Sequence, residues 1–117
     1  MNKQTTALRP GHEYQHYLDH DIAEPMDRIV QADNVMVVEA CCVLIELMAC
    51  TQPGYRDAAV ERWPQLASRI SADPDSEIAK MPGPFRTMMA LNIENSTLAD
   101  EHQDLWRIAN ILRHRVR

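Results

Sequence analysis

Residues 33–50 read DNVMVVEACCVLIELMAC, and this stretch is the most apolar in the chain. From Val35 to Cys50 only Glu39 and Glu46 carry a charge. A segment of this composition must be covered by other parts of the chain, because exposing so many apolar side chains to water is unfavourable. We therefore expect it to form the central element of the fold.

The central segment could be a strand or a helix. The β-branched residues at its start favour a strand, but its sixteen apolar-rich residues are too many for an ordinary strand, and most of the later ones are good helix formers. Asp33 or Asn34 offers an N-cap, and the sequence QPG at 52–54 is typical of a helix end. We predict a helix over about residues 33–51. It is too short and too charged for a membrane span, which needs about 20 apolar residues.

This helix has one wholly apolar face and one mixed face. The mixed face carries two carboxylates, seven residues apart, among apolar side chains. Its members are Val35, Glu39, Cys42, Val43 and Glu46. One interpretation is that this face binds a partner or a second copy, with the carboxylates at the rim or paired to arginine. The alternative is that a neighbouring helix covers the apolar part while both glutamates reach water past its edge.

The composition is that of a single globular domain of 117 residues, with 45% apolar and 25% charged residues. We expect residues 1–10 to be a flexible N-terminus and residues 11–117 to form one all-α domain. Three glycines and 5% aromatic residues argue against a β-sandwich or barrel rich in tight turns. The N-terminal sequence MNKQTTALRPG lacks the apolar region of a secretory signal. Together with three cysteines read as reduced, buried small side chains, this predicts a cytoplasmic protein.

The charge is unevenly distributed along the chain. The net charge is −5, and residues 11–51 hold eight acidic residues against one arginine, which gives −7. An acidic body disfavours non-specific binding of DNA or RNA. Four arginines between residues 105 and 117 are explained by a helix C-terminus, where positive charge is favourable.

The rest of the chain also has helical patterns, so we predict an all-α bundle of five to six helices. Helices are expected at residues 12–23, 26–32, 55–63, 64–72 and 85–93, with a short one ending near residue 81. A long C-terminal helix is expected over about residues 97–115, with Thr97 and Asp100 spaced as a capping box. The core stripe of this last helix is predicted to be Leu98, Leu105, Ile108, Ala109, Leu112 and Val116.

The residues give no support for an enzyme or a bound cofactor. Nucleophilic catalysis needs a nucleophile, a base and an orienting group brought together, and the serines and threonines occur in turns and caps. A glycine-rich phosphate loop is absent. His102 borders an apolar stripe and is better explained as a hydrogen-bonded boundary residue than as a catalyst. We therefore predict a non-enzymatic protein.

A row of histidines is the nearest approach to a chemical motif. His12, His16 and His20 follow one another at spacings of four, which places them on one helix face. Such a pair can ligate Zn²⁺ or another transition metal. However, the second Glu-x-x-His of di-iron bundles is absent, and the row lies opposite the predicted core positions. We expect an exposed polar face, and keep a metal-binding helical protein as an alternative.

The methionines form a second unusual feature. Phe85, Met88 and Met89 lie close together on the Met-rich segment, yet Met88 and Met89 diverge by about 100° on a helix. They cannot all point into one core. Methionine is a common core filler, and it is also common on adaptable binding surfaces. Tyr55, Trp63 and Trp106 are further candidates for interface anchors, although each flanks a predicted core stripe.

A resemblance to a known family rests on three features of the sequence. They are the size of the chain, the helix VMVVEACCVLIELMAC at 35–50 and the segment MPGPFRTMMALNI at 81–93. The chain resembles the QslA-like family of small helical quorum-sensing anti-activators. The resemblance implies a homodimer that binds the ligand-binding domain of a LuxR-type transcription regulator and blocks its dimerisation and DNA binding. It implies no cofactor, no membrane and no direct contact with nucleic acid.

On this interpretation the mixed face of the central helix and the Met-rich segment form the interface. The residues expected to contact the partner or a second copy are Val35, Glu39, Cys42, Val43, Glu46, Phe85, Met88 and Met89. A toxin-neutralising immunity protein would have the same small, acidic and helical character, and remains an alternative.

Overall fold

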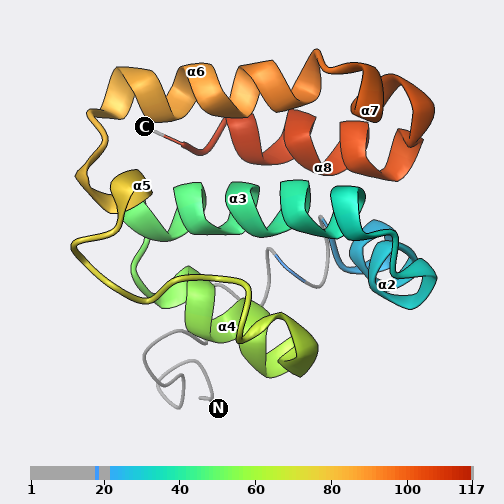
Figure 1. Ribbon diagram of the computed structural model, residues 1–117, viewed down its shortest axis with the longest axis horizontal. Helices are drawn as coiled ribbons and strands as arrows, with labels where there is room; N and C mark the ends of the chain where they lie inside the picture. Colours follow the sequence, from blue (N-terminus) through green and yellow to red (C-terminus); the bar gives the residue numbers. More distant parts are fainter. Residues whose placement is uncertain (1–17, 19–21, 117) are drawn as a thin grey trace, which may run out of the picture.

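The computed structural model describes Leu18 and residues 22–116, and these residues form an all-α bundle (Figure 1). The predicted fold class is confirmed. The described residues contain seven α-helices and one 3₁₀ turn. They are α2 (Ala23–Ala32), α3 (Val35–Thr51), α4 (Gly54–Arg62), η4 (Pro64–Leu66), α5 (Glu77–Lys80), α6 (Gly83–Glu94), α7 (Thr97–Glu101) and α8 (Gln103–Arg113). No helix in this part of the chain is long and apolar enough to cross a membrane.

The apolar stretch is the central helix, α3, as predicted. It runs through the middle of the bundle, with α6 and α8 on one side and α4 on the other (Figure 1). Its buried side chains face α8, α6 and α4 and lose most of their contact with water. These side chains are Val37, Val38, Cys41, Cys42, Leu44, Ile45, Leu47 and Met48.

A left-handed residue separates α2 from α3. Asp33 has φ 53° and ψ 39°, and its N–H donates to the carbonyl of Ile29. Aspartate tolerates this conformation better than most residues, so it can end a helix as glycine does. Asn34 then caps α3, its side-chain oxygen accepting from the N–H groups of Met36 at 3.1 Å and Val37 at 3.4 Å. Of the two caps considered from the sequence, Asn34 is the one used.

Replacing the cap residue should weaken the start of α3. We expect Asn34→Ala to lower the free energy of unfolding by about 1 kcal/mol, because two N–H groups lose their acceptor. Urea denaturation followed by circular dichroism measures this change. Asn34→Asp retains an acceptor and serves as the control, and an equal loss in both variants would contradict the role of the cap.

The C-terminal helix differs from the prediction in two respects, a break at His102 and the identity of its N-cap. His102 has an extended backbone (φ −127°, ψ 93°), which divides the segment into α7 and α8. The break lets Ala99 and Leu105, on either side of it, both reach the core. Ser96 caps α7 through the N–H of Ala99 at 3.2 Å, so the predicted capping role of Thr97 is wrong. The core stripe is confirmed, with Leu98 partly buried and the five later members fully buried.

The predicted helix over residues 64–72 is also wrong. Only the turn η4 forms, although Leu66 and Ile70 are both buried. The guanidinium of Arg56 donates to the carbonyl oxygens of Ile70 at 3.0 Å and Ala67 at 3.2 Å. A tertiary contact therefore satisfies carbonyls that a helix would otherwise use.

Candidate functional site

The mixed face of α3 is partly exposed, which both the partner-binding interpretation and its alternative allow. Val35 is 63% exposed and Glu39 is exposed, whereas Val43 and Glu46 are half-buried. Cys42 is buried, so its expected place in a contact surface is wrong.

Cys42 is covered because the chain after α4 returns past this side of α3. Burial raises the pKa of the Cys42 thiol to about 11, with Glu39 adding to the rise and Arg69 opposing it. Leu66 and Arg69 line one cavity with Val38, and the N–H of Ser71 donates to Glu46. Because Cys42 lies between Val38 and Glu46 on the same side of α3, the segment following η4 lies beside this part of the helix. The sequence could not reveal this neighbour, since the segment lacks the helical structure predicted for it.

The two glutamates of the mixed face have different environments. An oxygen of Glu46 accepts from the backbone N–H of Ser71 at 3.1 Å, which ties the loop after η4 to α3. Glu39 makes no hydrogen bond or ion pair with any residue that the structure describes. Glu46 therefore has a structural role, and Glu39 is the carboxylate of α3 that is free to meet a partner.

Met36 is an exposed residue that the sequence analysis did not single out. It is 67% exposed and follows Val35 in the first turn of α3. The signal was present, since Met36 lies three residues before Glu39 and seven before Val43, which places it on the same side of the helix as these members of the mixed face. Val35 and Met36 together place two large apolar side chains in water at one end of the central helix.

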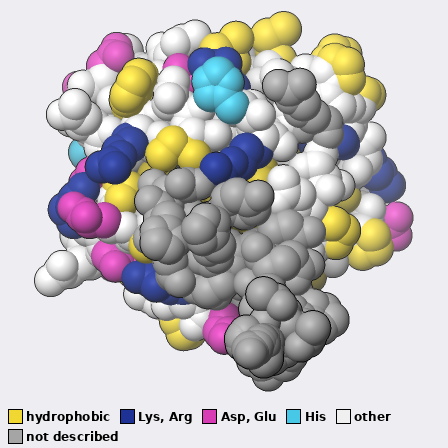
Figure 2. Space-filling model, turned by 180° about the vertical axis from the view of Figure 1, so that it is seen from behind, with side chains coloured by type: hydrophobic (Ala, Val, Ile, Leu, Met, Phe, Trp, Pro, Cys, Tyr) yellow, Lys and Arg dark blue, Asp and Glu magenta, His cyan; other side chains and the backbone are white. Residues whose placement is uncertain are grey.

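The Met-rich helix α6 presents the second exposed apolar group. Phe85 is 62% exposed and Met88 is 55% exposed, three residues apart on the same side of the helix. Met89 is half-buried against the core, so the predicted divergence of the two methionines is observed. Hydrophobic side chains gather along the upper edge of the molecule, over α6 (Figure 2).

The aromatic candidates divide into one exposed and two buried residues. Trp106 on α8 is 42% exposed, whereas Tyr55 and Trp63 are buried and cannot anchor an interface. The indole N–H of Trp63 donates to the carboxylate of Asp27 at 2.7 Å, joining α4 to α2. Trp63 is thus part of the bundle's internal structure.

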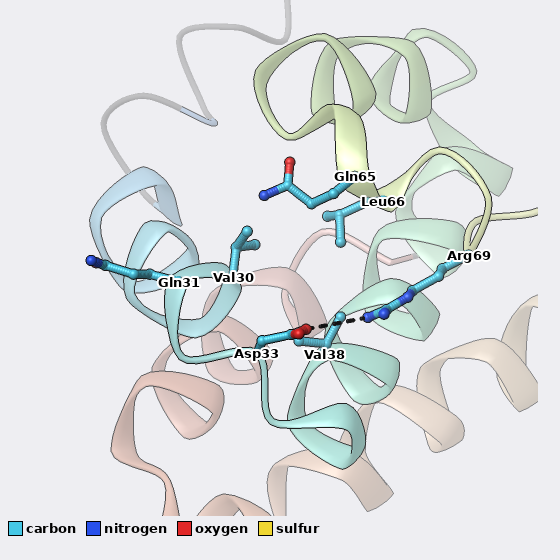
Figure 3. A pocket seen from close by; sticks show the side chains of 7 residues that line it. All are labelled: Val30, Gln31, Asp33, Val38, Gln65, Leu66 and Arg69. Atoms are coloured by element: carbon cyan, nitrogen blue, oxygen red, sulfur yellow. Dashed lines mark ion pairs between the residues drawn. The ribbon is translucent and has the colours of Figure 1, made fainter.

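A surface cavity of about 370 Å³ lies between the end of α2, the start of α3 and η4 (Figure 3). Apolar side chains contribute to its walls, and Asp33 and Arg69 form an ion pair of 4.0 Å across one side. The lining residues are Val30, Gln31, Asp33, Val38, Gln65, Leu66 and Arg69. Because the two charges compensate each other, the cavity does not concentrate charge of one sign.

The cysteines are poor nucleophiles. Cys41, Cys42 and Cys50 are free thiols, and burial raises the pKa of each. A raised pKa leaves little thiolate at neutral pH, and the thiolate is the reactive form. Among the described residues no group of three or more His, Cys, Asp or Glu side chains could hold a metal ion. His12, His16 and His20 lie outside the described residues.

Comparison of the chain with protein-family models, with curated proteins and with solved structures found no match. A functional assignment therefore rests on the residues and geometry of the chain itself. The fold and the exposed apolar residues define a small all-helical protein with two candidate protein-binding surfaces.

Proposed function

We propose that this protein is a non-enzymatic inhibitor that binds a LuxR-type transcription regulator and blocks both its dimerisation and its binding to DNA. Its contact surfaces are the exposed side of α3 around Val35 and Glu39 and the exposed side of α6 around Phe85 and Met88. The regulator's ligand-binding domain is the expected target, as the resemblance to quorum-sensing anti-activators implies.

The observation that carries this proposal is the exposure of Phe85 and Met88. A single exposed apolar side chain is ordinary in a soluble protein. Two large ones on the same side of one helix form a patch, and such patches commonly mark protein–protein contacts. Aromatic residues and methionine are enriched in interfaces of this kind.

Occupation of a dimer interface explains how such a protein could inhibit without touching DNA. A dimeric regulator reads a two-fold DNA site, so a monomer loses half of its contacts. The inhibitor needs no positive surface of its own, and its net charge of −5 disfavours binding to DNA. Its proposed task is to compete with the regulator's second copy.

Reconstitution with a purified LuxR-type regulator tests this function. A stoichiometric complex in size-exclusion chromatography, together with loss of the regulator's binding to its DNA site, is the expected result. If the regulator stays dimeric and bound to DNA at a tenfold excess of the inhibitor, the proposal fails.

Placing a charge on the apolar patch of α6 should weaken this complex. We expect Phe85→Asp to reduce affinity for the regulator at least about tenfold, because a carboxylate would lose its hydration at the contact. Isothermal titration calorimetry measures the change. Because Phe85 is 62% exposed, the fold itself should be retained. Gln65→Asp, which adds the same charge at an exposed site outside α3 and α6, is the matched control.

A further inference from the structure

Helices α3 and α6 contact each other and both pack on α8. Figure 1 shows that α3 and α6 run in opposite directions. The end of α3 and the start of α6 lie at the same end of the bundle (Figure 1). Both contact the segment around α5, since the Cys50 thiol donates to the carbonyl of Ile78 at 3.8 Å and the guanidinium of Arg86 donates to the carbonyl of Met81. Each residue of an α-helix advances by about 1.5 Å. Seven residues back from Cys50 lead to Val43 on α3, and seven residues on from Arg86 lead to Ile93 on α6, so each lies about 10 Å along its helix from that end of the bundle.

Apolar side chains follow this junction on both helices. Each of its inner members is only partly buried, with one side packed on the core and the other open to water. Met36 lies on the same side of α3 in its first turn and is exposed. We define the α3–α6 apolar band as Met36, Ala40, Val43, Met89 and Ile93.

Acidic side chains lie beside this band at the end where α3 begins. Glu39 lies within one helical turn of both Met36 and Val43, is exposed, and has no hydrogen-bond or ion-pair partner among the described residues. The short helix α7 adds the exposed Asp100 and Glu101 at the end of the bundle where α3 begins (Figure 1). An apolar strip beside free carboxylates is complementary to a partner that is both apolar and basic.

We propose that the α3–α6 apolar band binds an amphipathic helix of a partner protein, whose lysine or arginine side chains pair with Glu39. The proposal rests on the function proposed above and specifies the kind of element that the partner presents. Amphipathic helices dock by laying an apolar stripe, spaced at i, i+3, i+4 and i+7, along an apolar surface. From Met36 to Val43 the band extends about 10 Å, which matches about two turns of such a helix.

A second copy of this chain is a poorer occupant of the band. In a symmetric dimer the same patch meets itself across a two-fold axis. The Glu39 carboxylates of the two copies would then approach each other, and like charges at short distance disfavour the contact. A partner with the opposite charge removes this repulsion.

Two synthetic helical peptides of 18 residues test the proposal on the full-length protein. Both carry leucine at i, i+3, i+4 and i+7; one has lysine and the other glutamate on the polar face. Methyl NMR of the methionines reports the site directly. We expect the lysine peptide to shift the signals of Met36 and Met89 and to leave those of the fully buried Met26 and Met48 unchanged. Shifts elsewhere, or equal binding of the glutamate peptide, would overturn the proposal.

Two charge-reversal variants distinguish a specific effect of Glu39 from an effect of the protein's net charge. We expect Glu39→Lys to weaken binding of the lysine peptide about tenfold, since an attraction becomes a repulsion. Asp75→Lys makes the same change in net charge at an exposed residue outside the band, and should leave binding nearly unchanged. Equal losses in the two variants would show that only net charge matters, and would refute a site at Glu39.

The same variants separate this inference from the proposed function. If a LuxR-type regulator binds and Glu39→Lys leaves its affinity unchanged, the regulator docks elsewhere and the band is not its site. If the regulator does not bind while the lysine peptide binds at Met36 and Met89, the proposed function fails and the band remains a site for basic helices.

Discussion

Replacing Leu44 by alanine is expected to lower the free energy of unfolding by about 3 kcal/mol. Leu44 is fully buried in the middle of α3, the helix around which α4, α6 and α8 pack. Truncation removes apolar contacts and leaves a space that the surrounding helices can fill only in part. Urea denaturation monitored by circular dichroism provides the measurement.

The control for this variant lies on the same helix. Val35 is 63% exposed, so Val35→Ala should change the free energy of unfolding by less than about 0.5 kcal/mol. Alanine is also the better helix former, which offsets the small loss of contacts. Similar destabilisation by the two variants would mean that α3 does not have one buried and one exposed side, and would contradict the central position of this helix.

The central helix could be predicted from the sequence because its signals are local. The length of the apolar run, the cap at Asn34 and the stop after Thr51 all lie within or beside the helix. The core stripe of α8 was predictable for the same reason, since Leu105, Ile108 and Leu112 repeat at helical spacing.

The errors share a different physical origin, which is contact between segments distant in sequence. Residues 64–72 have helical composition, but the side chain of Arg56 donates hydrogen bonds to the carbonyl groups of Ala67 and Ile70. The same segment contacts α3 at Val38 and Glu46, on either side of Cys42, which is buried although it was expected at the surface. A pattern within one helix cannot show which neighbour covers its edge.

The candidate site was predicted in part for a related reason. Exposure of Phe85 and Met88 agrees with the divergence of side chains along one helix, which is a local property. Which of Glu39 and Glu46 lacks a hydrogen-bond partner depends on where the loop at Ser71 lies. Only the structure shows that the N–H of Ser71 donates to Glu46. The two carboxylates look equivalent in sequence and have different environments in the fold.

Replacing Glu94 by glutamine should have the second large effect, a loss of about 2 kcal/mol in the free energy of unfolding at pH 7. Glu94 is the one charged residue that is buried among those described, and it joins α6 to α8. Its carboxylate accepts hydrogen bonds from Nε of Arg113 and from Nδ2 of Asn110, the latter at 3.1 Å. The side chain of Arg113 is 26% exposed, so water can solvate the guanidinium in the variant. This limits the loss in the free energy of unfolding.

The contribution of the Glu94 carboxylate to the free energy of unfolding should decrease as the pH falls. The hydrogen bond from Arg113 lowers the pKa of Glu94 below its ordinary value of 4.5; burial opposes the change and Asn110 adds to it. A carboxyl group whose pKa is lower in the folded than in the unfolded chain stabilises the fold fully above the unfolded pKa. That stabilisation is lost as the pH falls through the folded pKa.

The unfolding free energies of the wild type and Glu94→Gln should therefore differ most near pH 7 and converge as the pH falls below the ordinary carboxyl pKa of 4.5. Urea denaturation at a series of pH values measures both proteins under the same conditions. Glu101→Gln removes an exposed carboxylate from α7 and should follow the wild type throughout. A constant difference between wild type and Glu94→Gln at all pH values would show that shape, rather than the charge of the Glu94 carboxylate, holds α6 to α8.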